Sequence, residues 1–322
     1  MQATVIGAGV VGLATALELA ERGARVTLLE RSADLGGGAS WLAGGMLAPF
    51  CEGESAPACV VERGAKAIDW WGRRVPGVVR EGTLVVAPAR DVGEIDRFAA
   101  RTRGRERVDE AAIAALEPDL AGRFARGLFF ASEGHLDPRA ALRALREDLT
   151  ARGAILRFGV DGEGEEARGV VFDCRGFAAR PDLADLRGVR GEMILVRTRE
   201  VALKRSVRLL HPRIPLYIVP RADGVFMIGA TMIESADRGA MSVRSAIELM
   251  SAAYALHPAF GEAEVLEMRA DVRPAFPDNE PRIVETNGRI YVNGFYRHGF
   301  LLAPDFAARA AALAFDRGEA AA

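Results

Sequence analysis

Apolar and polar residues at the start of the chain follow the pattern of a strand, a helix and a second strand. Residues Ala3 to Ile6 form a short, mostly apolar run, and a glycine-rich turn leads from it into a helix expected to end near Arg22. Gly23 is placed to stop that helix, because glycine readily adopts the left-handed backbone of a helix C-terminus. The run from Arg25 to Glu30 predicts the second strand, so the chain opens with a βαβ unit.

The turn of this unit contains Gly7, Gly9 and Gly12 in the spacing GxGxxG. Such glycines permit a tight turn, close approach of the backbone to a pyrophosphate, and close packing of helix on strand. The phosphates would lie on the amides at the helix N-terminus. Glu30 ends the second strand near the spacing of about 20 residues expected of an acid that accepts ribose hydroxyls. The context favours a dinucleotide site over an ordinary α/β turn.

Further apolar runs predict additional strands and helices. Strands are expected at Thr83–Ala87, Gly127–Ala131, Ile155–Phe158, Val170–Cys174, Glu192–Arg197, Leu216–Pro220, Val225–Thr231 and Arg289–Asn293. Helices are expected at Pro138–Arg152, Ser242–Leu256 and Phe300–Phe315. Asp137 is the expected N-cap of the first of these helices, and an acidic turn is expected over Asp161–Glu166.

Two kinds of sheet follow from the order of these elements. Strands that alternate with helices are typical of a parallel sheet, and strands joined by turns are typical of an antiparallel one. We therefore predict an α/β fold in which a Rossmann-like nucleotide-binding domain is interleaved with an antiparallel α+β substrate domain. The nucleotide-binding domain is expected to comprise residues 1–75, 135–180 and 268–322, and the substrate domain residues 76–134 and 181–267.

Composition and charge exclude several functions. The chain has 322 residues and a formal net charge of −2, so no overall basic field favours nucleic acid or an acidic membrane surface. The arginines of Arg101–Arg107 are followed by Asp109 and Glu110, which favours a solvated loop over an RNA-binding patch. Only Lys66 and Lys204 are lysines, and neither lies in a phosphate-binding loop or in a setting typical of a Schiff base.

Cysteine and histidine usage argues against a metal site. Cys51, Cys59 and Cys174 lack the CxxC spacing of a zinc site, and the four histidines are too far apart for a local metal motif. The uncharged run from Met1 to Leu17 has no basic residue before it and is interrupted by glycines, so neither a signal peptide nor a membrane span is expected. We expect a protein without metal in the reducing cytoplasm.

Three later segments carry further chemistry: Gly36–Pro49, which is rich in small residues, Arg269–Pro281 with the sequence RADVRPAFPDNEP, and Asn293–Pro304 with NGFYRHGFLLAP. Small residues beside a nucleotide site suggest a backbone that lies flat against a planar ring, and a flexible loop is the alternative. Arg273, held extended by Pro274, can present a fork of donors to a carboxylate.

These segments, the glycine-rich N-terminus and the run YIVPRADGVFMIGATM at 217–232 resemble the FAD-dependent D-amino-acid oxidase family, in particular its ThiO-type glycine oxidases of thiamine biosynthesis. The resemblance covers the whole chain. It implies non-covalent FAD and a small amino-acid substrate, glycine first, oxidised by hydride transfer to the flavin. It also implies O2 as acceptor with release of H2O2, and an imine product for thiazole synthesis. Functional coupling to a thiazole synthase and a homo-oligomer are further expectations.

Matching motifs assign roles to particular positions. Those placed against the cofactor are Gly7, Gly9, Val10, Val11, Gly12, Glu30, Arg31, Ala39, Ser40, Gly44, Gly45, Met46, Val160, Phe295, Tyr296, Arg297, His298, Gly299, Phe300 and Leu301. Those placed around the substrate are Arg273, Arg297, Tyr217 and Met232. The alternative for each arginine is a structural ion pair, and for the other two it is core packing. No catalytic residue is assigned, because hydride chemistry belongs to the cofactor and a neutral amine needs no base.

The chain also departs from the family pattern. Trp41 and Arg175 stand where smaller residues are usual, and the segment from Val160 to Cys174 is short. Rival functions are a D-amino-acid dehydrogenase that reduces a membrane quinone, a sarcosine-type oxidase, a flavin- or nucleotide-binding sensor, and a partner domain in RNA modification. Balanced charge and the absence of a second catalytic domain count against RNA modification. No exposed apolar or basic amphipathic segment is evident in the sequence, which counts against the membrane quinone.

Overall fold

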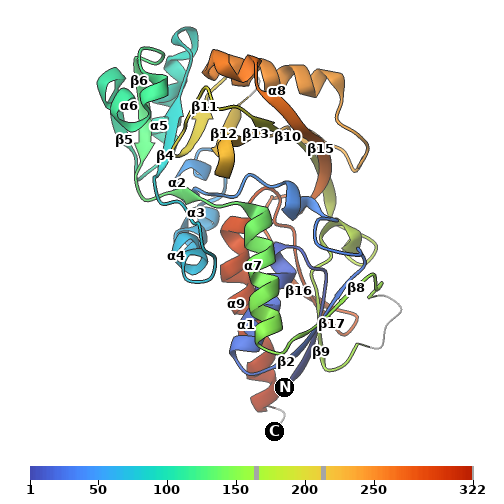
Figure 1. The fold of residues 1–322 in the computed structure, drawn as a ribbon. Coiled ribbons are helices and arrows are strands. Elements are labelled where there is room, and N and C mark those ends of the chain that lie inside the picture. Colours follow the sequence, from blue (N-terminus) through green and yellow to red (C-terminus); the bar gives the residue numbers. More distant parts are fainter. Residues whose placement is uncertain (163–166, 212–214, 321–322) are drawn as a thin grey trace.

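The structure of the chain, a computed structural model, describes residues 1–162, 167–211 and 215–320, and Figure 1 shows their arrangement. Two large sheets occupy the two halves of the molecule, and both termini lie in the half that contains the smaller of them. Most of the predicted acidic turn Asp161–Glu166 falls outside the described residues. Within the described ranges, no helix combines the length and apolar character needed to cross a membrane.

The smaller sheet has six strands in the order β16, β17, β9, β1, β2 and β8. Their bounds are β1 Gln2–Ile6, β2 Arg25–Glu30, β8 Ile155–Phe158, β9 Val170–Asp173, β16 Arg282–Thr286 and β17 Arg289–Asn293. Five of these strands are parallel, and β16 is antiparallel to β17. The predicted Rossmann-like sheet is therefore confirmed.

Three long helices pack beside this sheet (Figure 1): α1 Val10–Glu21, α7 Pro138–Ala151 and α9 Gly299–Ala320. Helix α1 contacts both of the others, and buried residues such as Leu13, Leu145 and Ala307 join them in one core. The Asp137 side chain accepts hydrogen bonds from the amides of Arg139 and Ala140, as expected of the N-cap of α7.

The larger sheet has nine strands. Its order is β14, β10, β13, β12, β11, β4, β6 and β5, and β15 also pairs with β10. The bounds are β4 Thr83–Val86, β5 Glu106–Asp109, β6 Arg126–Phe130, β10 Arg187–Arg197, β11 Ser206–Leu209, β12 Leu216–Pro220, β13 Val225–Gly229, β14 Ile233–Glu234 and β15 Glu264–Ala275. The pairs are antiparallel, as predicted, except for the parallel pair β4 and β11.

Shorter helices lie in both halves: α5, α6 and α8 beside the larger sheet, and α3 and α4 beside α9 (Figure 1). Their bounds are α2 Pro49–Glu52, α3 Ala58–Gly64, α4 Ala67–Gly72, α5 Gly93–Arg101, α6 Glu110–Leu116 and α8 Val243–Leu256. Helix α8 lies across the large sheet and begins at its N-cap Ser242. Two short strands, β3 Met46–Leu47 and β7 Gly134–His135, pair with each other.

Several predicted boundaries are wrong. The predicted domain boundary at residue 268 falls inside β15, which pairs with β10 along its length, so residues 268–275 belong to the larger sheet. Most side chains from Glu264 to Arg269 are exposed, and this hides the alternating pattern of a strand. Arg107, predicted in a loop, lies in β5, and α9 extends beyond Phe315. Strands β11 and β16 were not predicted.

Candidate active site

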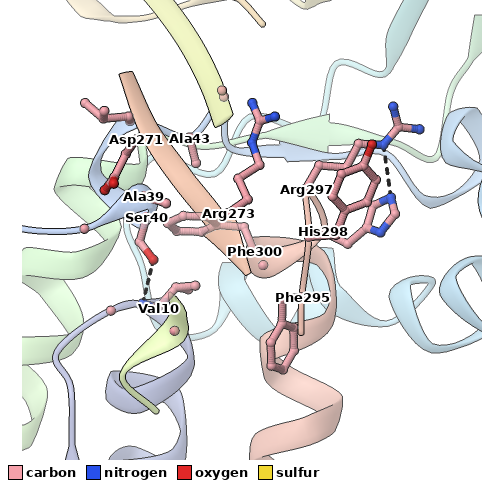
Figure 2. A pocket seen from close by; sticks show the side chains of 18 of the residues that line it. Val10, Ala39, Ser40, Ala43, Asp271, Arg273, Phe295, Arg297, His298 and Phe300 are labelled. Carbon is pink, nitrogen blue, oxygen red and sulfur yellow. Dashed lines mark hydrogen bonds between the residues drawn. The ribbon is translucent and has the colours of Figure 1, made fainter. Parts of the chain in front are cut away.

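A cavity of about 800 Å³ lies between the two sheets, a volume typical of small-molecule and cofactor sites. Its walls come from the turn after β1, residues 34–46, strands β11, β12 and β15, and residues 295–301 (Figure 2). Of the positions assigned from the sequence, all line this cavity except Gly12 and Val160. The structure thus brings together residues from both ends and from the middle of the chain.

Three glycines shape the turn between β1 and α1. Gly7 has a φ of +102°, and a Cβ there would lie 2.7 Å from the carbonyl oxygen of Cys174. A Cβ on Gly12 would lie 1.8 Å from the carbonyl oxygen of Gly7, so Gly12 permits α1 to pack against the turn. A Cβ on Gly9 would lie 3.3 Å from the Ser40 hydroxyl. Tight turning and close packing, as predicted, explain these glycines.

The N-terminus of α1 opens onto the cavity. Val10 and Val11 line the wall, and the amide of Val10 donates a hydrogen bond of 3.1 Å to Ser40 Oγ (Figure 2). The first amides of a helix have no partner within the helix, and the helix dipole makes them favourable to anions. This end of the cavity can therefore hold a pyrophosphate, and Val10, Val11 and Ser40, which were assigned to the cofactor, line it.

Glu30 ends β2 at the same part of the cavity. Its Oε2 accepts a hydrogen bond of 2.7 Å from the amide of Ala8, and its Oε1 accepts one of 2.8 Å from the amide of Ser32. The carboxylate is thereby fixed beside the glycine turn, where a ribose would lie. Val160 bonds to the backbone of Glu30 through its amide, and the described residues that line the wall next to it are Asp161 and Gly162.

The small residues between Gly36 and Met46 are explained in part by contacts within the protein. A Cβ on Gly44 would lie 2.8 Å from the ring of Tyr217, and Gly45, with φ of +77°, would place one 2.2 Å from the carbonyl oxygen of Leu136. This segment includes the short 3-10 helix at Ala39–Leu42. Close packing of this segment on Tyr217 and on the backbone of Leu136 therefore requires small residues here, in addition to any requirement from a planar ring.

Trp41, which departs from the family pattern, contacts two arginines of α7. The guanidinium carbons of Arg139 and Arg143 lie 5.1 Å and 5.0 Å from its ring centroid, within the range of cation–π contacts. Arg139 also pairs with Glu267 of β15 at 2.7 Å. Trp41 thus lies at a junction of the two sheets and fixes the segment that carries Ser40.

Arg175, the other departure, also lines the cavity. Its Nε donates to Asp173 at 2.8 Å, and its Nη2 contacts Asp182 at 2.8 Å. Both carboxylates come from the same part of the chain, so this arginine has a structural pairing.

The start of α9 forms the far wall of the cavity. Residues 295–301, all assigned to the cofactor, line it, and the amide of Tyr296 donates to the carbonyl of Pro274 at 2.7 Å. A Cβ on Gly299, the first residue of α9, would lie 3.3 Å from a methyl group of Val10. The N-termini of α1 and α9 therefore meet at the cavity, as Figure 2 shows.

Arg273 extends from β15 into the cavity (Figure 2). Its Nη1 donates to the carbonyl of Thr231 at 3.0 Å, and a Cβ on Gly191 of the neighbouring strand would clash with the guanidinium at 2.2 Å. Among the described residues, no carboxylate forms an ion pair with Arg273. The Thr231 carbonyl and the space left by Gly191 therefore position the guanidinium, which can pair with the carboxylate of a ligand.

Tyr217 and Met232 line the same part of the wall. Tyr217 lies on β12 and packs on Gly44, so it takes part in packing as well as in the cavity. Met232 is 46% exposed, and its sulfur accepts a hydrogen bond of 3.2 Å from the Tyr296 hydroxyl. Both predicted positions therefore face the cavity.

Arg297 differs from Arg273, because a buried carboxylate holds it. Its Nη2 lies 2.6 Å from Glu52 Oε2 and donates to Ser55 Oγ at 2.9 Å. The alternative of a structural ion pair thus describes Arg297 in this structure. Glu52 also accepts from Arg208 Nη2 at 2.8 Å and contacts His298 Nε2 at 2.9 Å.

Sequence reasoning missed Glu52, Arg208 and the pair Asp271 and Arg238, which lie 2.8 Å apart on the cavity wall. A carboxylate after the apolar run Pro49–Cys51 is the one signal for Glu52, and it is weak. The partners of Glu52 lie far away in the sequence, on β11 and at the start of α9.

Comparisons with known proteins agree with this geometry. The family model of FAD-dependent oxidoreductases, DAO, matches residues 2–313. A Rhizobium etli protein named as the thiamine biosynthesis oxidoreductase ThiO is 58% identical over 97% of this chain and 95% of its own length. A glycine oxidase of Pseudomonas aeruginosa is 30% identical over 93% of this chain and 91% of its own.

The fold is also that of a solved structure. The crystal structure of glycine oxidase from Geobacillus kaustophilus superimposes with a TM-score of 0.83 at 23% identity, covering 98% of this chain and 94% of that one. The fold, the cavity and the family match lead to one conclusion, which the sequence resemblance predicted: this chain belongs to the DAO family of FAD-dependent oxidoreductases.

Proposed function

We propose that this chain is an amino-acid oxidase of glycine, or of another small amino acid, with O2 as acceptor. The observation that carries the proposal is Arg273, whose guanidinium lines the cavity and is held by the Thr231 carbonyl. The planar carboxylate of an amino acid matches the fork of guanidinium donors. The identity of 30% to a glycine oxidase supports glycine as the first substrate to test.

The cavity residues fit FAD held without a covalent bond. The amides of α1 and Ser40 would contact the pyrophosphate, Glu30 the ribose, and residues 44–46 and 295–301 the ring system. Burial raises the pKa of Cys174, the cysteine on the cavity wall, so its thiol is a poor nucleophile for covalent attachment. When bound, FAD supplies the two-electron acceptor; the positive end of α9 favours negative charge at that wall.

The residues of the chain would then bind and orient the substrate. Arg273 would hold the carboxylate through two parallel hydrogen bonds, and Tyr217 and Met232 would limit the space around Cα. The Cα–H of glycine leaves with its electron pair and the nitrogen loses a proton, which gives the imine. The two electrons finally reduce O2, which with two protons becomes H2O2. A neutral amine needs no base, so the proposal assigns none.

The biological setting belongs to the same proposal. The name of the R. etli relative supports a role in thiamine biosynthesis. We place this role in the cytoplasm, with the imine passed on to a functionally coupled thiazole synthase. Glycine, sarcosine and small D-amino acids differ by groups of about one methylene, which a pocket distinguishes by roughly 1–3 kcal/mol. Direct measurement therefore has to rank them.

A substrate panel tests the proposal. Purified protein is assayed for O2 uptake and H2O2 release with glycine, sarcosine, D-alanine and D-proline, and with L-alanine as control. We expect one H2O2 per O2, the highest kcat/KM with a small amino acid, and yellow supernatant containing FAD after denaturation. Reduction of a quinone analogue without H2O2 would instead support a dehydrogenase, and colour retained in the precipitate would contradict non-covalent binding.

A further inference from the structure

Glu52 is a buried carboxylate on the cavity wall that the proposed reaction does not use. It is 9% exposed and ends the short helix α2, directly after the small-residue segment. Three side chains bond to it: Arg208 at 2.8 Å, Arg297 at 2.6 Å and His298 at 2.9 Å. All four residues line the cavity, so this cluster forms part of the same wall as the substrate arginine.

The cluster fixes the charge of Glu52. Burial opposes ionisation of its carboxyl, but Arg297 and Arg208 outweigh burial and hold its pKa well below the ordinary value. Burial also lowers the pKa of His298, which keeps the imidazole neutral near pH 7. Glu133, on the far side of Cys51, contributes a further carboxyl that interacts with Arg208. Near neutral pH, two guanidiniums are thus balanced chiefly by Glu52.

Arg273 and Arg297 lie against the same short segment of the wall. Arg273 donates to the carbonyl of Thr231, and Arg297 Nη1 lies 3.6 Å from the sulfur of the next residue, Met232. Figure 2 shows both guanidiniums directed toward the same side of the cavity. Either arginine could therefore bind an anionic group of the substrate. They differ because Arg297 already forms an ion pair with Glu52.

We propose that Glu52 is a positioning residue that determines specificity: by holding Arg297, it reserves Arg273 for one carboxylate and disfavours substrates with a second anionic group. The proposal rests on the proposed role of Arg273. A second carboxylate at Arg297 would have to displace Glu52, which would then lose one of its two guanidinium partners and keep Arg208. The incoming carboxylate would also approach the charge of Glu52 itself. Both effects oppose dicarboxylates.

Binding of small carboxylates to the FAD-loaded protein tests the proposal without turnover. Dissociation constants are measured by calorimetry, and by the change in flavin absorbance, for matched pairs of equal chain length: propionate and malonate, butyrate and succinate, valerate and glutarate. In wild type the monocarboxylate of each pair is expected to bind more tightly. In Glu52→Gln, the preference should shift toward the dicarboxylate at least tenfold for one or more pairs, because Arg297 is released.

Two further variants separate release of Arg297 from a general change of charge. Glu54→Gln removes the same charge two residues away, from a carboxylate paired at 3.0 Å with the exposed Arg101, and should leave every ratio within threefold of wild type. The double variant Glu52→Gln/Arg297→Gln should lose the shift in preference toward the dicarboxylate. If Glu52→Gln does not fold, Glu52→Gln/Arg208→Gln frees Arg297 while keeping the net charge of wild type, and it should show the same shift.

The outcomes distinguish this proposal from the proposed function. Unchanged ratios in the folded Glu52 variants would overturn the specificity role, as would a shift of equal size in Glu54→Gln or one that survives loss of Arg297. A wild-type protein that oxidises no amino acid and binds no monocarboxylate would instead overturn the proposed function itself. Parallel weakening of both members of each pair would show that Glu52 is only structural.

Discussion

The two sides of the cavity are built in different ways. On the side of α1, glycines and backbone amides form the wall, and Glu30 is fixed by the amides of Ala8 and Ser32. On the side of the large sheet, charged side chains from distant segments form it, such as Arg273 and the cluster around Glu52. The comparison teaches that a local motif can predict the conformation of a wall made of backbone, whereas no local motif shows which charged side chains of distant segments pair with each other.

The largest expected effect comes from the charged side. Arg273→Ala removes the fork of donors and leaves a substrate carboxylate without compensation. Transition-state stabilisation for glycine should therefore fall by about 3–5 kcal/mol, a loss of roughly 10²–10⁴-fold in kcat/KM. Anaerobic bleaching of the bound flavin by glycine measures it in a single turnover. The bleaching rate of Arg273→Lys should lie between those of wild type and Arg273→Ala, because lysine keeps the positive charge but loses the fork of donors.

Flavin content separates the two sides in this experiment. FAD bound per protein should be unchanged in Arg273→Ala, and Arg269→Ala, which removes an exposed arginine of the same strand, should leave bleaching near wild type. If low concentrations of glycine bleach the flavin of Arg273→Ala at the wild-type rate, the substrate carboxylate binds elsewhere. The proposed difference in role between Arg273 and Arg297 would then be wrong.

The second largest effect is a pH dependence of stability that arises from the buried carboxyl of Glu133. Burial raises the pKa of Glu133 from 4.5 to about 7, and its Oε1 accepts from the amide of Cys51 at 2.8 Å. Between about pH 5 and 7 the folded protein keeps a proton that the unfolded chain releases, so this group stabilises the fold at low pH and the stabilisation is lost as pH rises. The full contribution is up to about 3 kcal/mol.

Urea unfolding of wild type and Glu133→Gln at pH 5.5 and pH 8 measures this contribution. The variant has no proton to lose at this position. The free energy of unfolding of Glu133→Gln minus that of wild type should therefore be larger at pH 8 than at pH 5.5. The lowered pKa of His135, about 4, acts in the opposite direction but is present in both proteins and drops out of the difference. A difference independent of pH would show that Glu133 titrates alike in both states.

The backbone side is tested by Glu30→Gln. The amide keeps the shape of the side chain, but its NH2 group would face the amide of Ala8 or Ser32, and the charge that accepts the ribose hydroxyls is lost. FAD affinity should fall by about 1.5–3 kcal/mol, which equilibrium dialysis or fluorescence titration measures. Glu106→Gln, an exposed change on the far strand β5, is the control; equal affinities in all three proteins would mean that Glu30 faces away from FAD.

The smallest effect is expected at the junction between the two sides. Trp41→Leu removes the ring that contacts Arg139 and Arg143, so the segment carrying Ser40 should be less well fixed. FAD should bind about 1–2 kcal/mol more weakly, with Trp41→Phe close to wild type because it keeps an aromatic face. If the leucine variant binds FAD as tightly as the phenylalanine variant, the cation–π contacts do not position this segment.

Much of the cofactor side was predictable from the sequence. The glycines, the strand that ends at Glu30 and the cap at Asp137 depend on the conformations that neighbouring residues can adopt, and the structure has them where the sequence predicted. The edge strand β15 was not predictable in the same way. Its exposed residues lack the alternation of a half-buried strand, so only its pairing with β10 identifies it.

The sequence by itself determined the local elements, the family resemblance and the residues that gather at the cavity, because these follow from short-range backbone preferences and contiguous motifs. The tertiary structure decided which arginine is paired with a carboxylate of the chain. From the sequence, Arg273 and Arg297 are both assigned to the substrate, with a structural ion pair as the alternative for each. Only the fold places Glu52 at 2.6 Å from Arg297 and leaves Arg273 on a carbonyl, since ion pairs form between residues that are near in space, whatever their separation in the chain.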